Sequence, residues 1–141
     1  MHYLDTSVII ALLTREVHSE RAEAWLARQD PANLCISDWV VTEVSSALSI
    51  KLRSGILTPT LRAAILARWH RSIAENFASV PIFSRHFETA ATFADRHETG
   101  LRAGDALHLA IASEAGCAVA TFDHIMAAAA PLVGVPLAEL G

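Results

Sequence analysis

The hydrophobic positions of the chain fall into two alternating patterns, namely short apolar runs and longer segments with apolar side chains at helical spacing. The short runs predict strands, because the buried strands of a parallel sheet are almost continuous in apolar side chains. We expect strands at 2–5, 33–37, 79–83 and 117–122, and a last short one within 132–140. Pro81 marks the third as an edge strand or a link, since proline cannot donate a ladder hydrogen bond.

The segments between these runs predict helices, because apolar residues recur in them every three or four positions. Ser37 can cap the third helix, and Gly55 and Gly100 can end two of them. In the segment 84–100 we expect the buried side to consist of Phe87, Ala90, Ala91 and Ala94. The expected helices are 6–13, 18–28, 38–54, 59–77, 84–100, 105–115 and 124–130.

Strands that alternate with helices indicate an α/β protein with a parallel sheet, right-handed crossovers and helices on both faces. With 141 residues, of which 52% are hydrophobic and 18% charged, we expect residues 1–141 to form one folded domain. No apolar run is long enough to span a bilayer, and the first residues lack the basic region of a signal peptide. We therefore expect a cytoplasmic protein that does not enter the membrane.

Acidic side chains stand at the ends of these predicted elements. Asp5 and Asp123 each follow a strand, Asp105 opens a helix, and Glu43 projects inward from the helix after the second strand. Taken singly, an aspartate in such a place is often only a helix cap or a turn residue. Together they point to a site, because the carboxyl ends of parallel strands share one edge of the sheet.

Several carboxylates close together cannot all ionise unless a positive charge lies among them. Oxygen ligands suit a hard cation that keeps some of its waters, so we expect Mg²⁺, or Mn²⁺, rather than zinc. Such an ion supports hydrolysis of a phosphodiester, since it acidifies an attacking water and neutralises the leaving oxygen. Thr6, Ser7 and Thr121 adjoin the acids and can orient them, contact phosphate, or merely cap helices.

The charge of the chain leaves the substrate open. The net charge is −4, but once the four acids of the expected site are set aside, eleven acidic residues balance eleven basic ones. Arg102, three residues before Asp105, is the best candidate for a phosphate contact by position, and its alternative is an exposed charge beside a helix. Cys35 and Cys117 lie in apolar segments without metal-binding spacing, so we expect buried free thiols.

Four segments resemble a known family when they are taken in order and at their separations. They are LDTSVII at 4–10, TEVSSAL at 42–48, GDALHLAIA at 104–112 and TFD at 121–123. They resemble the PIN-domain family and, within it, the VapC-type toxins of bacterial type II toxin–antitoxin pairs, over essentially the whole chain.

The resemblance implies a three-layer α/β/α PIN-like fold with a central five-stranded parallel sheet. It implies a Mg²⁺-dependent endoribonuclease that cleaves RNA, in which Asp5, Glu43, Asp105 and Asp123 are the catalytic and metal-binding acids. It also implies an antitoxin protein as the partner that masks the site.

Other interpretations stay open from the residues alone. The chain can be a catalytically weak PIN-fold binding module that acts through a protein partner. An aspartyl-phosphate mechanism at Asp5 fits less well, because position 7 is serine and the only lysine is Lys51. His108, one turn after Asp105, is better explained as a hydrogen-bonded core histidine than as a general base.

We also expect a homodimer, because the helices carry more large apolar side chains than one small sheet can cover. The candidates for such uncovered side chains are Trp25, Trp69 and Phe77.

Overall fold

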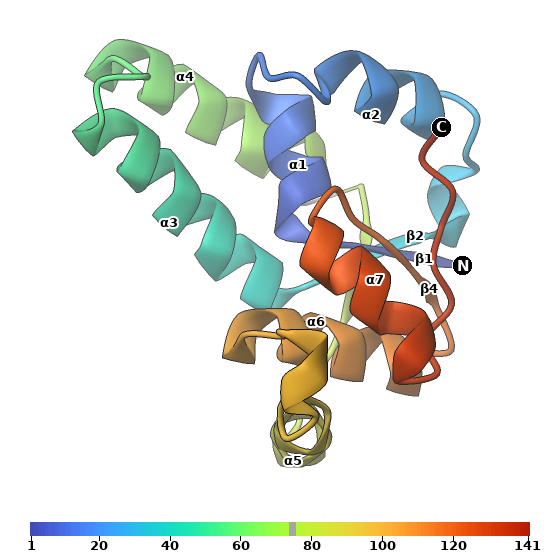
Figure 1. Ribbon diagram of the computed structural model, residues 1–141. Coiled ribbons are helices and arrows are strands. Elements are labelled where there is room, and N and C mark those ends of the chain that lie inside the picture. The colour runs from blue at the N-terminus through green and yellow to red at the C-terminus, as the bar shows by residue number, and fades with distance from the viewer. Residues whose placement is uncertain (74–75) are drawn as a thin grey trace.

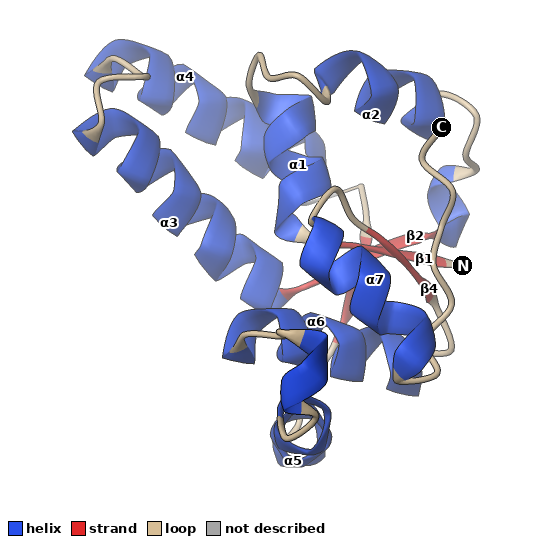
Figure 2. Ribbon diagram, in the orientation of Figure 1, coloured by secondary structure: helices blue, strands red, loops and turns tan. Residues whose placement is uncertain are grey.

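The computed structural model describes residues 1–73 and 76–141. Within these residues a parallel sheet of four strands, in the order β3-β2-β1-β4, lies at the centre (Figure 1). Figure 2 shows the strands between helices, with α1, α2 and α4 on one side and α5 and α6 on the other. The strands are β1 (His2–Leu4), β2 (Leu34–Ser37), β3 (Ala78–Val80) and β4 (Ala118–Ala120). The helices are α1 (Thr6–Leu13), α2 (Ser19–Leu26), α3 (Asp38–Arg53), α4 (Pro59–Arg68), α5 (Ser84–Ala94), α6 (Ala103–Glu114) and α7 (His124–Leu132).

Strand β1 is central, and its register fixes the edge at which the site forms. His2 pairs with Leu34 of β2 on one side and with Ala118 of β4 on the other, in parallel in both cases. The carboxyl ends of three strands therefore lie side by side. The turns that follow β1 and β4 carry Asp5 and Asp123, as the sequence predicted for a parallel sheet.

The fifth strand implied by the resemblance is reduced to one bridge, so within the described residues the sheet has four strands rather than five. Leu137 pairs in parallel with Val119, whose N–H donates to the Pro136 carbonyl at 2.8 Å. The ladder cannot extend backward, because Pro136 has no N–H and Gly134 has a φ of +80°. The last strand was thus correctly placed but overestimated in length.

Two predicted helices differ from the structure. The helix expected at 59–77 ends at Arg68 and is followed by a π-helical turn, Trp69–Ile73; residues 74 and 75 lie outside the described residues. In α5 the buried side consists of His86 and Ala90, whereas Phe87 is 56% exposed. The helix is rotated relative to the prediction because His86 Nε2 contacts Glu114 of α6 at 3.0 Å.

The hydrophobic core contains two of the three side chains proposed for a dimer interface. Trp25 and Trp69 are 3% and 0% exposed, and Phe77 packs partly buried against the same core. Cys35 and Cys117 are buried free thiols, as expected, with their Sγ atoms 3.7 Å apart. Burial raises the pKa of Cys35 to about 12. Among the helices that the structure describes, none is long and apolar enough to cross a membrane.

Candidate active site

An open cavity of about 490 Å³ lies at the carboxyl-terminal edge of the sheet. Asp5, Glu43, Asp105 and Asp123 all line it, so the structure brings together the four acids that the sequence singled out. They come from four places in the chain, namely the end of β1, α3, α6 and the end of β4. Among the described residues that line this cavity there is no lysine or arginine.

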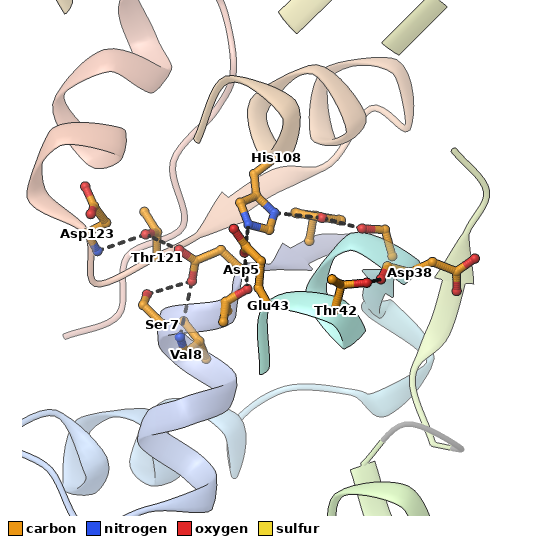
Figure 3. A network of polar contacts seen from close by, with 12 residues as sticks. Asp5, Ser7, Val8, Asp38, Thr42, Glu43, His108, Thr121 and Asp123 are labelled. Atoms are coloured by element: carbon orange, nitrogen blue, oxygen red, sulfur yellow. Dashed lines mark hydrogen bonds and ion pairs between the residues drawn. The ribbon is translucent and has the colours of Figure 1, made fainter. Parts of the chain in front are cut away.

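Asp5 is held in one position by groups from two elements. It is the N-cap of α1, and its Oδ1 accepts hydrogen bonds from the Val8 N–H at 3.2 Å and the Ser7 hydroxyl at 2.6 Å. Its Oδ2 accepts one from the Thr121 hydroxyl at 2.7 Å (Figure 3). Burial nevertheless raises the pKa of Asp5, because removal from water disfavours the charged form more than these contacts favour it.

Glu43 contacts a buried chain of polar groups. His108 Nε2 lies 2.6 Å from Glu43 Oε2 (Figure 3). The other ring nitrogen of His108, Nδ1, lies 2.9 Å from the Tyr3 hydroxyl. Tyr3 in turn contacts the Ser37 hydroxyl at 2.7 Å. His108 is 2% exposed, as expected for a core histidine, but the sequence gave no sign that its ring contacts an acid of the site.

The charge of Glu43 is favoured by this contact. Burial opposes the ionised carboxylate, but the hydrogen bond and charge of His108, together with the Thr6 hydroxyl, outweigh it and lower the pKa of Glu43. Glu43 and Asp5 therefore differ in their tendency to ionise, although both line the same cavity.

Asp105 and Asp123 complete the acidic set. Asp105 lies in the first turn of α6, and Asp123 directly precedes α7. The Oδ2 atom of Asp105 accepts a hydrogen bond from the Arg102 N–H at 3.0 Å, and Asp123 caps α7 through the Met126 N–H at 2.8 Å. Burial raises the pKa of Asp105, and the negative charges of Asp123 and Glu43 add to this effect. An excess of negative charge therefore faces the cavity.

The hydroxyls beside the acids contact those acids directly. Thr6 donates to Glu43, whereas Ser7 and Thr121 both donate to Asp5. Arg102 is different, because its exposed side chain does not line the cavity and only its backbone N–H contacts Asp105.

Two rings that the sequence did not single out also line the cavity. His18 precedes α2, and Phe122 lies between Thr121 and Asp123. The rings are stacked, with centroids 4.5 Å apart and planes 4° from parallel. The only signal in the sequence was the place of Phe122 between two residues already assigned to the site.

The residues present fit a hard divalent cation. The donors are carboxylate and hydroxyl oxygens, and among the described residues that line the cavity no lysine or arginine balances their charge. Among the described residues, no three side chains of His, Cys, Asp or Glu lie close enough together to hold a metal ion as they stand. The carboxylates would therefore have to draw together around an ion.

The sequence model of the PIN domain matches residues 2–131. A search of curated protein sequences found no match.

Solved structures of the same fold include toxins and toxin–antitoxin complexes. The chain is similar to FitAcB from Neisseria gonorrhoeae, with a TM-score of 0.80 and 22% identity over 99% of this chain and 98% of that chain. It is similar to the VapC20 toxin of Mycobacterium tuberculosis, which cleaves the sarcin–ricin loop, with a TM-score of 0.71 and 20% identity over 92% and 95%. A toxin–antitoxin complex from Klebsiella pneumoniae gives a TM-score of 0.56 and 20% identity over 87% of each chain. Because the family match spans nearly all of its residues, the chain belongs to the PIN domain family.

Proposed function

We propose that this protein is a Mg²⁺-dependent endoribonuclease that hydrolyses RNA phosphodiester bonds and serves as the toxin of a VapBC-type toxin–antitoxin pair. The observation that carries the proposal is the convergence of Asp5, Glu43, Asp105 and Asp123 on one open cavity. Membership of the PIN domain family and the likeness in fold to the VapC20 toxin support it.

In this proposal the acids bind Mg²⁺, for which Mn²⁺ can substitute. When bound, the ion supplies an electrophile for the phosphodiester and a more acidic water. Glu43 is suited to remain ionised beside His108, which lies 2.6 Å away. Asp105, half-buried in the same cavity, is suited to hold the ion or to orient an attacking water. Ser7 and Thr121 hold Asp5 in place while substrate binds and leaves.

The proposed protein partner is an antitoxin that masks the cavity. The Klebsiella pneumoniae structure, which shares the fold, is a toxin–antitoxin complex. An open cavity with excess negative charge is a surface that a basic segment of such a partner would complement.

A second proposed partner is another copy of the chain. Phe87 of α5 is 56% exposed and borders an apolar groove whose lining includes Trp39 of α3 and Leu107 of α6. A homodimer would remove Phe87 and this groove from water, whereas Trp25 and Trp69 already lie in the core.

The alternative function is a PIN-fold binding module whose chemistry is weak or absent. It would keep the fold and the partner surface but would not need divalent metal. The presence of all four acids in one cavity favours the nuclease.

Cleavage of structured RNAs with and without Mg²⁺ tests the proposal. We expect Asp5→Asn and Asp105→Asn to lower the cleavage rate by about a hundredfold or more while the protein stays folded, since they remove charge and not packing. Asp95→Asn is the matched control, because Asp95 is exposed at the end of α5. This variant should cleave RNA as fast as the wild type does. Growth inhibition on expression should disappear with the first two variants only. Cleavage retained by purified Asp105→Asn, free of other nucleases, would contradict the mechanism.

A further inference from the structure

The stacked rings of His18 and Phe122 form a wall between two cavities. Both rings line the acidic cavity, and both also line a neighbouring cavity of about 250 Å³. A molecule that fills both cavities must therefore pass along these rings.

The position of Phe122 is tied to that of the acids. Its N–H donates to the Ser7 hydroxyl at 2.8 Å, and this hydroxyl donates to Asp5 at 2.6 Å. On the other side, the Asp123 N–H donates to the Thr121 hydroxyl at 2.9 Å, which also contacts Asp5. The ring is thus held at a fixed place relative to the carboxylates.

An arginine lies on the far side of this wall. Arg21 and His124 line the second cavity together with His18, and Glu139 is the acidic residue in that lining. The guanidinium carbon of Arg21 lies 5.4 Å from the centroid of the Phe122 ring, and the group also donates to the Gly141 carbonyl. Among the ion pairs of the described residues, none engages Arg21.

A second group of a histidine, a phenylalanine and an arginine, elsewhere in the chain, has a structural role and serves as a comparison. On α5, Arg85 lies 4.2 Å over the ring of Phe83, which stacks on His86. There Arg85 and His86 both pair with Glu114, and His86 Nδ1 accepts the N–H of Phe83. In contrast, the buried Nδ1 of His18 has no hydrogen-bond partner within the described residues.

We propose that His18, Phe122 and Arg21 form a subsite for the nucleotide next to the scissile phosphodiester. The base of this nucleotide stacks on the rings, and Arg21 contacts the phosphate of the nucleotide. Stacking on aromatic rings accepts any base, and arginine suits phosphate oxygens, so the occupant is single-stranded RNA rather than a protein segment. The scissile phosphate then lies among the carboxylates, on the other side of the ring wall. This inference rests on the proposed ribonuclease function.

Binding of a fluorescein-labelled single-stranded RNA of mixed sequence, followed by anisotropy with Mg²⁺ in the Asp105→Asn background, tests the subsite. We expect Phe122→Leu to weaken binding by about fivefold to a hundredfold, the usual contribution of one stacked base. Phe83→Leu is the matched control and should bind as the parent does. Arg21→Gln should also reduce the slope of log affinity against log salt concentration by about 0.7, whereas Arg85→Gln should not.

Kinetics in the wild-type background separate the subsite from the chemistry. We expect Phe122→Leu to raise KM for RNA with little change in kcat, because the ring acts on binding and not on the reacting atoms. If wild type cleaves RNA but Phe122→Leu and Phe83→Leu behave alike, the subsite is refuted and the ribonuclease stands. If wild type neither binds nor cleaves RNA, both proposals fail. Competition by polyglutamate as strong as that by unlabelled RNA would also refute the subsite, because charge alone would then explain binding.

Discussion

Glu43 Oε2 and His108 Nε2 lie 2.6 Å apart, although 65 residues separate them in the chain. The contact joins the acidic cavity to the buried Tyr3 hydroxyl, which lies 2.9 Å from the other ring nitrogen of His108. His108 therefore contacts a buried hydroxyl and a half-buried carboxylate at once. Its loss would leave Tyr3 only the Ser37 hydroxyl and Glu43 only the Thr6 hydroxyl among the contacts described above.

We expect His108→Phe to lower both stability and activity. The free energy of unfolding should fall by about 1–3 kcal/mol, because the Tyr3 hydroxyl and the Glu43 carboxylate lose a buried partner. The cleavage rate should fall as well, since Glu43 loses the contact that favours its charge and position. Thermal melts and RNA cleavage assays measure the two effects.

His86→Phe is the matched control for this change. His86 is equally buried and also contacts a glutamate, Glu114, at 3.0 Å, but it lies outside the acidic cavity. It should lose stability and keep its cleavage rate per folded molecule. Equal cleavage rates for the two folded variants would show that His108 has no role in the site.

Gly104 adjoins the same carboxylate and gives a second test of its position. A Cβ at this residue would lie 3.0 Å from Glu43 Oε1, so that Gly104→Ala must displace the carboxylate by a few tenths of an ångström. The substitution should also favour the helix by up to about 1 kcal/mol. We therefore expect a protein of equal or greater stability that cleaves RNA more slowly. Ser113→Ala, at an exposed position of the same helix, is the control and should leave cleavage unchanged. If Gly104→Ala cleaves RNA as fast as Ser113→Ala does, this prediction is wrong.

The sequence predicted where the acids lie but not what holds them. Asp5 and Asp123 follow apolar runs, and the geometry of parallel strands alone places them at one edge of the sheet. The contact of His108 with Glu43 could not be predicted, because a histidine on an otherwise apolar helix looks like a core residue. It depends on how α3 and α6 pack, which no local pattern records.

The rotation of α5 has the same kind of cause. Apolar spacing favoured Phe87 as a buried residue, but the pairing of His86 with Glu114 turns the helix and exposes the ring. The short last strand also depends on tertiary context, since Leu137 forms its bridge to Val119 beside a proline. Local patterns thus located these elements, while long-range contacts determined their orientation and extent.

The exposed ring of Phe87 allows a direct test of the homodimer. We expect the wild type to sediment as a dimer at micromolar concentration and Phe87→Glu to dissociate at least about tenfold more readily, because a charge in an apolar interface is costly. Ile56→Glu is the control, since Ile56 is 66% exposed and does not line this groove. A wild-type monomer without antitoxin would rule the dimer out.

The last prediction concerns how pH and metal act on stability. Burial raises the pKa of both Asp5 and Asp105 in the folded state. Between the ordinary value of about 3.9 and the raised one, the folded protein binds more protons than the unfolded chain. The contribution of these two groups to the free energy of unfolding is therefore lost as pH rises through their folded pKa values. Glu43, whose pKa is lowered, acts in the opposite sense and loses its contribution as pH falls through its folded value.

Mg²⁺ should reverse the loss caused by the two raised groups. It binds the ionised carboxylates of the folded state and adds about 2.7 kcal/mol when its concentration is a hundredfold above Kd. We expect the gain to be larger at pH 8 than at pH 6, because protons compete with the metal at the lower pH. Asp105→Asn should melt higher than the wild type in EDTA and respond less to Mg²⁺, since it removes one of the repelling charges. Asp95→Asn should follow the wild type in both respects.

Thermal melts of the wild type, Asp105→Asn and Asp95→Asn at pH 6 and pH 8, in EDTA and in Mg²⁺, test this prediction. The sign of each difference follows from which state holds the protons, so that the experiment does not depend on the catalytic rate. If the wild type melts at the same temperature in EDTA and in Mg²⁺ at pH 8, and Asp105→Asn melts no higher in EDTA, the four acids do not share a cation. The cavity would then be an acidic surface without a metal, and the binding module would be the better explanation of the chain.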